Sequence, residues 1–445
     1  MGSDSCGSGL ETDSKTILPF DPATVATETE SPQATSARYS ECPIGPSAKT
    51  VRAEKGSENE SSVASPDPQE ECPQEEELQE QEQEQKNQHK KSMKSTQTFT
   101  MTISSRTPPP PMIIDIYYPH WSLGLRYDVQ ILSVVLKNIL GDQHQIRCYG
   151  IGPKVYRDAG NTKQIFEKLN ETGDIAIFLE RIFNRDFLKN YSQRIFIPNP
   201  EWFLEPSVTV LPLQIDTVWH KSRTSLETFK KRYPDIKHYF TGFTSKDPKI
   251  QAQDYNSFAH FRGKSQHRNT QKLLNIWSRR PTLPHIRVQL YGPDANVQLP
   301  FWMSHGNISL MMGYYKEHAD YFKALAESGI HFCTSEVEGF GHYINESRAM
   351  GALIVSTDGS PMNELINPTY GFLIPSHKQI EQHAGTRYQV EEDAIENVIE
   401  QVLSITPTDR KERGMLARQA FLKDRRQFQN RIAEFFEHEK TTTQN

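Results

Sequence analysis

A turn with two glycines, between a buried strand and a helix, constrains the fold of this chain more than any other feature. Residues 329–334 are apolar and β-compatible, and from about residue 343 the pattern is helical until Gly351 ends the segment. Between strand and helix, Gly339 and Gly341 let the backbone approach a ligand closely. The free amides at such a helix start suit a phosphate. The segment therefore predicts an α/β fold with an anion site at the carboxyl end of a strand.

Two carboxylates lie on either side of this turn. Glu338 stands at the carboxyl end of the strand, where it faces whatever group is attached to the phosphate. Glu346, about one turn into the helix, can reach a ribose diol, and the backbone amides of Phe340 and Gly341 are the expected phosphate donors. An acidic residue near a helix start is also favoured by the helix dipole alone. Because two carboxylates and two glycines occur in register, we interpret the segment as a sugar-nucleotide site.

The segment resembles the E-x7-E signature of retaining glycosyltransferases of family 4 (glycosyl transferases group 1), which have the GT-B architecture. The features that follow in the order usual for that family are Gly351, a buried strand at 353–356, Asp358 and Glu364. Leu353 is a departure, since the family commonly has proline there. The resemblance implies two Rossmann-like domains facing across a cleft, and retention of the anomeric configuration. It also implies that Glu338 contacts the donor sugar's hydroxyls and that Glu346 binds the ribose hydroxyls.

A basic loop at residues 261–270 follows the first strand of the second half of the chain and precedes a helix. Gly263, Lys264 and Arg268 are the residues expected to hold a diphosphate, and Arg262 could substitute for either cation. Two cations against a diphosphate stabilise charge in the bound nucleotide and on the leaving group. The resembled family has an Arg and a Lys in this loop, in the opposite order and farther apart. A solvated basic loop is the alternative interpretation.

The first half of the chain has fewer readable site residues. Gly124 follows the first strand, where the family keeps a glycine-rich loop near the donor phosphates, but the usual paired glycines are missing. His120, Glu180 and Asn199 are weaker candidates for the cleft, and Glu364 is either a supporting residue of the site or a helix cap. The tryptophans are expected mostly in the core, although any of them could stack on a sugar. They are Trp121, Trp202, Trp219, Trp277 and Trp302.

Strand and helix patterns alternate from residue 112 to residue 405, which indicates parallel α/β sheets. The expected strands are 112–118, 145–149, 174–179, 194–198, 215–219, 238–243, 258–261, 286–291, 307–310, 329–334, 353–356 and 370–374. The other expected helices are 126–140, 162–169, 222–233, 270–277, 316–328, 394–403 and 408–436. We place the domains at 109–247 and 248–405, with a polar hinge at 246–257. The resemblance implies that a C-terminal helix, within 406–445, crosses back to the first domain.

Residues 1–108 are rich in Ser, Thr, Glu, Gln and Pro, and cannot bury enough surface to offset chain entropy. We predict that this tail is disordered, because a coiled coil in its Glu/Gln tract would have Leu78 as its only large apolar residue. A protein partner could bind through it.

The composition of the 445-residue chain, with net charge -6, suits a soluble protein of more than one domain and argues against broad nucleic-acid binding. The most apolar candidate for a membrane span, 131–140, is too short, and the first thirty residues hold no apolar core of a secretory signal. Five scattered cysteines support neither a disulfide framework nor a zinc site. A glycan on Asn345 would block the predicted site, so we expect a cytoplasmic location.

These patterns lead to a main hypothesis and two rivals. The main one is a retaining glycosyltransferase that moves a sugar from a UDP- or GDP-sugar to an unknown acceptor. Neither metal nor cofactor is expected, because the basic loop and helix start supply positive charge and no DxD-like cluster stands at a strand end. A catalytically degenerate homologue that binds a nucleotide sugar or a protein is the first rival. A Rossmann oxidoreductase is weaker, since Gly339-Phe340-Gly341 lacks a third glycine.

Overall fold

The computed structural model describes residues 111–152, 172–182, 186–204, 211–212, 214–291 and 306–442, and the structural statements below concern these residues. The expected tail at 1–108, the expected helix at 162–169 and Trp302 lie outside them.

The first half of the chain forms a six-stranded parallel sheet in the order β2-β1-β3-β4-β5-β6. Its strands are β1 (Ile113–Pro119), β2 (Gln145–Ile151), β3 (Ile175–Leu179), β4 (Gln193–Ile197), β5 (Thr217–His220) and β6 (Lys237–Phe240). Helix α2 (Leu123–Leu140) follows β1, and α6 (Arg223–Arg232) joins β5 to β6. Because β1 pairs with β2 on one side and β3 on the other, the strand order reverses there. Open α/β sheets bind ligands at the carboxyl ends of strands beside such a reversal.

The second half forms another six-stranded parallel sheet, in the order β12-β11-β10-β7-β8-β9. Its strands are β7 (Asp254–Phe261), β8 (Ile286–Leu290), β9 (Ile308–Met312), β10 (Ser328–Cys333), β11 (Leu353–Asp358) and β12 (Gly371–Pro375). The helices are α7 (Thr270–Arg279), α8 (His318–Ala326), α9 (His342–Ala349), α10 (Met362–Leu365) and α11 (Glu392–Ser404). The order reverses between β7 and β10. The basic loop leaves β7 and the two-glycine turn leaves β10, so both emerge at this reversal. The predicted pair of Rossmann-like domains is confirmed.

Two local expectations were wrong. Strand β7 starts at Asp254, inside the expected hinge, because Tyr255 and Ser257 are buried while Asp254 and Asn256 alternate with them at the surface. Gly124 lies in the first turn of α2 rather than in a loop, because the Ser122 side chain caps that helix by accepting from the Leu125 amide.

The structure also has an antiparallel hairpin, β13 (Lys378–Gln382) and β14 (Gly385–Gln389), which the sequence did not predict. Its strands are mostly polar and lack the apolar run or alternation that marks a half-buried strand.

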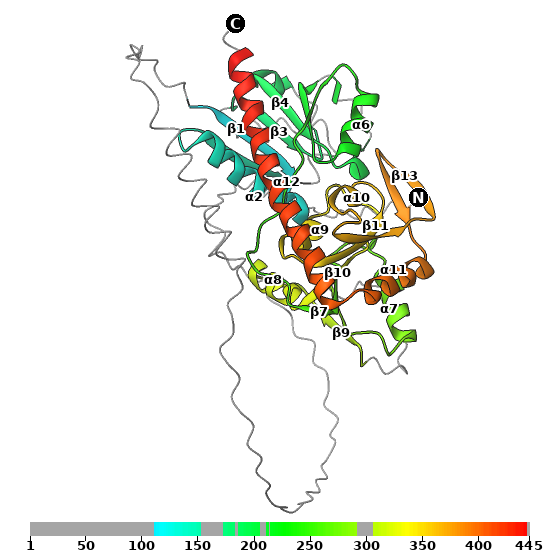
Figure 1. Cartoon of the computed structure of the whole chain (residues 1–445). Helices are drawn as coiled ribbons and strands as arrows, with labels where there is room; N and C mark the ends of the chain where they lie inside the picture. Colours follow the sequence, from blue (N-terminus) through cyan, green and yellow to red (C-terminus); the bar gives the residue numbers. More distant parts are fainter. Residues whose placement is uncertain are drawn as a thin grey trace, which may run out of the picture. The chain divides into compact units, whose positions relative to one another are not determined.

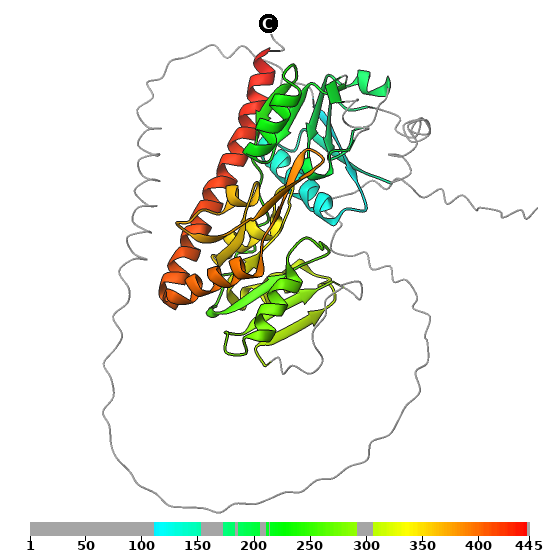
Figure 2. The ribbon, with the colours of Figure 1, turned by 90° about the vertical axis from the view of Figure 1, so that its right-hand side faces the viewer.

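The C-terminal helix α12 (Pro407–Thr442) runs along both sheets in both views (Figure 1 and Figure 2). In the second domain, Asp424 of α12 accepts from Arg348 of α9 at 2.5 Å. In the first domain, the ring of Phe435 lies 4.9 Å from that of Trp219 in β5, centroid to centroid. The helix thus ties the two domains together. Among the described residues, no helix is both long and apolar enough to cross a bilayer.

Candidate functional site

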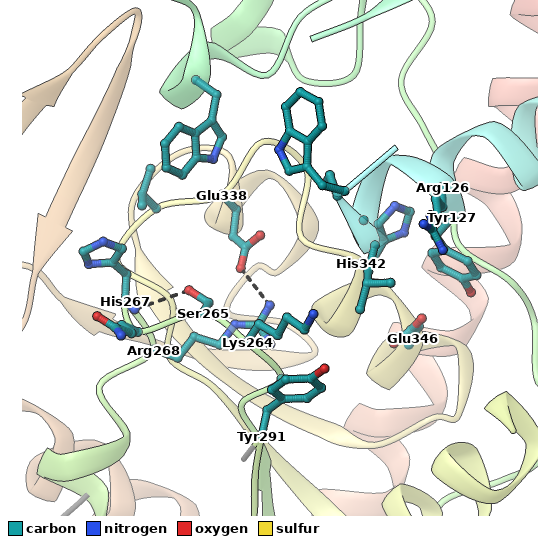
Figure 3. Close-up of a pocket in the computed structure, with 18 of the residues that line it drawn as sticks. Arg126, Tyr127, Lys264, Ser265, His267, Arg268, Tyr291, Glu338, His342 and Glu346 are labelled. Atoms are coloured by element: carbon teal, nitrogen blue, oxygen red, sulfur yellow. Dashed lines mark hydrogen bonds and ion pairs between the residues drawn. The ribbon is translucent and has the colours of Figure 1, made fainter. Parts of the chain in front are cut away.

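A cavity of about 920 Å³ lies where the carboxyl ends of the two sheets meet, and this volume is in the range of small-molecule sites. From the first domain it is lined by the start of α2 and by residues near the ends of β3 and β4. From the second domain it is lined by the basic loop, by the segment from Tyr314 to Tyr321, and by the start of α9. Figure 3 shows side chains from both domains pointing into it.

The structure brings six of the nine predicted site residues to this cavity. They are Glu338, Glu346, Gly263, Lys264, Arg268 and Gly124. The other three, Gly339, Phe340 and Gly341, are not among the residues that line it. The first residue of α9, His342, lines it instead.

The turn at 339–341 packs one domain against the other. A Cβ on Gly339 would meet the Asn199 side chain at 2.5 Å, and the Phe340 ring packs edge-on against Phe243, 5.5 Å between centroids. Gly341 has a φ of 99° at the cap of α9, a conformation that favours glycine. Because Phe340 is buried there, the role of the Phe340 and Gly341 amides as phosphate donors stays a prediction.

Glu338 and Arg268 both line the cavity and contact each other (Figure 3). The guanidinium Nη2 of Arg268 lies 3.4 Å from Oε1 of Glu338, and the Ser335 hydroxyl donates to the same oxygen at 2.6 Å. Arg268 also lies 3.7 Å from the centroid of the Tyr343 ring, a cation–π contact. These contacts hold both charges in fixed positions.

Lys264 is the second cation of the loop that lines the cavity, and its ammonium lies 4.6 Å from the Tyr291 ring centroid. Arg262 does not line the cavity, and its ability to replace Lys264 or Arg268 stays a prediction. Its Nε donates to the Ser265 carbonyl at 2.7 Å and so braces the loop. The order of the two cations along the chain therefore remains the reverse of the family's.

Glu346 is 6% exposed and accepts from the Tyr321 hydroxyl at 3.3 Å. Burial raises the pKa of Glu346, against the opposing effects of His342 and of hydrogen bonds from Tyr127 and Tyr321. A buried carboxylate of this kind gains from a ligand that donates hydrogen bonds to it.

A polar network missed by the sequence reasoning joins the two domains beside the cavity. Buried Asp128 of α2 accepts from the Lys221 ammonium at 2.5 Å and lies 2.6 Å from Nε2 of His342. Nδ1 of His342 lies 2.8 Å from the Ser245 hydroxyl. Burial would raise the pKa of Asp128, but Lys221 and His342 outweigh burial and lower it. The partners lie 93 and 214 positions from Asp128, so no local pattern could reveal them.

The weaker candidates separate into two groups. Glu180 lines the cavity and is held by Asn199, whose side-chain amide donates to Oε2 of Glu180 at 2.9 Å. His120 does not line it, and its Nδ1 lies 3.1 Å from the Ile151 carbonyl oxygen. Glu364 is a helix cap: it accepts from the backbone amides of Arg223 and Thr224 at the start of α6, at 2.6 and 2.9 Å.

The tryptophans also separate. Trp219 and Trp277 are fully buried core residues, as expected. Trp121 and Trp202 are 45% and 48% exposed and line the cavity. Among the described residues, no group of three or more His, Cys, Asp and Glu side chains is arranged to hold a metal ion.

Comparison with solved structures identifies the architecture. Sucrose-phosphate synthase from Thermosynechococcus elongatus matches 74% of this chain and 100% of its own, with a TM-score of 0.52 and 10% identity. Trehalose-6-phosphate synthase OtsA matches 74% of this chain and 98% of its own, with a TM-score of 0.51 and 8% identity. Anabaena HepE in complex with UDP and glucose matches 73% and 99%, with a TM-score of 0.50 and 13% identity.

A scan against protein-family models found no match, and a search of the curated proteins found no similar sequence. At such identities a structural match establishes the fold alone. The described part of this chain therefore has the GT-B fold of glycosyltransferases, with two Rossmann-like domains facing across a cleft.

Proposed function

We propose that this protein is a retaining glycosyltransferase that moves a sugar from a UDP- or GDP-sugar to an acceptor. One observation carries the proposal: Lys264, Arg268, Glu338 and Glu346 line a single cavity at the carboxyl ends of both sheets. Two cations suit a diphosphate, and a buried carboxylate beside them suits the ribose diol. The solved HepE complex, with UDP and glucose, is consistent with a nucleotide sugar on this fold.

In this proposal the donor diphosphate lies between the basic loop and the start of α9. Lys264 and Arg268 stabilise the negative charge that grows on the leaving phosphate as the glycosidic bond breaks. Glu346 accepts hydrogen bonds from the ribose, and Glu338, fixed by Arg268 and Ser335, accepts from hydroxyls of the donor sugar.

Retention follows from a displacement in which the acceptor attacks the face that the nucleotide leaves. The acceptor hydroxyl oxygen forms the new bond to the anomeric carbon. Its proton passes to the departing phosphate oxygen. The products are a nucleoside diphosphate and the glycosylated acceptor. This route needs the protein mainly to position groups and stabilise charge.

Ligand-induced thermal shift tests the donor site. We expect UDP or GDP to raise the melting temperature and NAD to leave it unchanged. Glu346→Gln should weaken the binding of that nucleotide by about tenfold, whereas Glu412→Gln, on an exposed part of α12, should not change it. Stabilisation by NAD alone would favour an oxidoreductase.

A measurement of turnover distinguishes an enzyme from a catalytically degenerate homologue. The reversed order of Lys264 and Arg268 is the observation that favours this second candidate. We expect slow hydrolysis of a UDP- or GDP-sugar by the wild type, and loss of at least about tenfold in that rate in Lys264→Ala. Lys323→Ala, on the exposed side of α8, is the matched control. Nucleotide binding without hydrolysis of any donor in the panel would support a binding module.

A further inference from the structure

The first-domain side of the cavity carries a group of residues that the donor does not use. The short 3-10 helix η2 (Pro200–Trp202) presents Glu201 and Trp202, and the end of β3 presents Glu180. We call these three residues the η2 wall.

Glu201 is the central residue of the η2 wall. It lines the cavity, is 6% exposed, and its Oε2 has no hydrogen-bond partner among the described residues. A buried polar oxygen without a partner costs about 1–3 kcal/mol, so a native protein rarely keeps one without a reason. A ligand hydroxyl that reached this carboxyl group would supply the partner.

Glu180 has an unusual backbone. Its φ is 63°, in the left-handed region that a residue with a side chain rarely adopts. Such a conformation costs about 1–3 kcal/mol and concentrates at functional sites. The strain is accompanied by a fixed side chain: the Asn199 side-chain amide donates to Oε2 of Glu180, and Oδ1 of Asn199 accepts from the Lys221 ammonium at 3.0 Å.

Trp202 supplies an apolar face to the same wall. It is 48% exposed, although it is large and apolar, and an exposed aromatic ring in a cavity can cover the C–H face of a sugar. The unpredicted β13–β14 hairpin holds it in place. The Ala384 amide of the hairpin donates to the Pro200 carbonyl at 3.0 Å, and the His383 ring lies 6.5 Å from that of Trp202.

We propose that the η2 wall is the acceptor subsite, and that it takes an uncharged, polyhydroxylated acceptor: a sugar or polyol without a phosphate group. The proposal rests on the proposed function, since an acceptor here would lie beside Glu338 and the donor sugar. Two carboxyl groups beside an exposed aromatic ring match the hydroxyl edge and C–H face of a sugar ring.

The charges favour an uncharged acceptor over a phosphorylated one. Burial, with the charges of Glu180 and Glu338, raises the pKa of Glu201 to about 8, so its carboxyl is neutral at pH 7 and can both donate and accept. The two arginines on this side of the cavity already donate to backbone carbonyls: Arg126 to His120 at 2.8 Å and Arg181 to Trp202 at 3.0 Å. Arg181 also lies 3.7 Å from the Glu180 carboxylate. An added phosphate would meet the carboxylates of Glu180 and Glu338, and each of these arginines already commits one N–H to a backbone carbonyl.

The experiment measures probe binding to the full chain saturated with UDP, or with GDP if that is the nucleotide bound. The probes are glucose, mannose and myo-inositol, with glucose 6-phosphate as the charged counterpart. We expect saturation-transfer NMR to detect at least one neutral probe, binding more tightly than glucose 6-phosphate. Glu201→Leu and Trp202→Ala should each weaken it by about tenfold, while Glu201→Gln, which mimics the neutral carboxyl, should retain it.

The nucleotide affinity of each variant is the internal control and should be unchanged. If the nucleotide binds but no neutral probe does, the acceptor proposal fails and the proposed function stands. The same holds if glucose 6-phosphate binds more tightly, or if neither Glu201→Leu nor Trp202→Ala changes probe affinity. If neither UDP nor GDP binds, both proposals fail.

Discussion

Glu201 shows how one residue can connect the site to stability. Its folded-state pKa of about 8 lies above the ordinary value of 4.5, because of burial and the nearby charges of Glu180 and Glu338. Between these values the folded state binds more protons than the unfolded state. The stability that this group contributes is therefore present at low pH and is lost as the pH rises through about 8.

Glu201→Gln should remove that loss, because the amide stays neutral. We expect the variant and the wild type to be similar in stability near pH 5, and the variant to be more stable at pH 9 by an amount on the order of 3 kcal/mol. Chemical denaturation at the two pH values measures this difference. An equal effect at both pH values would mean that Glu201 is not a protonated buried acid.

At the residue scale, the sequence predicted those cavity-lining residues that belong to either of two continuous segments, the basic loop and the two-glycine turn. Glu338, Glu346, Lys264 and Arg268 follow strand ends, and the carboxyl ends of parallel strands meet at one edge of a sheet. Asp128 and Glu201 could not be found in this way. Their neighbours in the fold lie far away along the chain, and an isolated Asp in a helix or Glu in a turn carries no signal.

Among the elements, α12 depends on a close contact at Gly414. A Cβ there would lie 2.0 Å from the Gly351 carbonyl oxygen, which is backbone and cannot move aside. Gly414→Ala should therefore lower the free energy of unfolding by about 1–3 kcal/mol, although alanine is the better helix former.

Gly124 provides the matched control. It lies in α2, where a Cβ would have only the Ser122 hydroxyl oxygen within reach, at 4.0 Å. Gly124→Ala should stabilise the protein by about 0.5–1 kcal/mol. The melting temperatures of the two variants test these opposite predictions. Stabilisation by Gly414→Ala would rule out the close packing of α12 on Gly351.

The elements themselves were predictable to different degrees. Strands such as 175–179 are continuous apolar runs buried on both faces of a parallel sheet, so their composition marks them. The β13–β14 hairpin is polar, and its position depends on direct contacts with η2 of the other domain. The cap that Glu364 supplies to α6 likewise links two helices from different domains.

On the scale of the whole molecule, three buried histidines set the response to acid. Burial lowers the pKa of His220 to about 3, and those of His260 and His331 to about 4. In the unfolded chain they titrate near 6.5, so below that pH the unfolded state binds protons that the folded state does not. The stability that these histidines contribute therefore falls as the pH drops from about 6.5 towards 4, opposite to the contribution of Glu201.

We expect the free energy of unfolding to fall between pH 7 and pH 5 by roughly 2 kcal/mol for each of these histidines. Urea denaturation across this range measures the slope. His331→Gln should make the slope shallower, whereas substitution of the exposed His377 should not. If His331→Gln left the slope unchanged, the His331 ring would be protonated in the folded protein.

The two-sheet architecture was predictable because alternation of strands and helices extends over most of the described chain. Each of these patterns indicates a parallel α/β sheet. The way the domains meet was not, since it depends on Asp128, His342 and the turn at 339–341, where side chains from both halves pack together.

Hydrogen–deuterium exchange of the full chain, with and without saturating UDP and, separately, GDP, tests the central claim most directly. The claim is that the diphosphate group of the bound nucleotide lies between the basic loop and the start of α9. We predict that one of these nucleotides slows exchange at residues 262–269 and 337–346. Slowed exchange only at other segments, or none with either nucleotide, would contradict it.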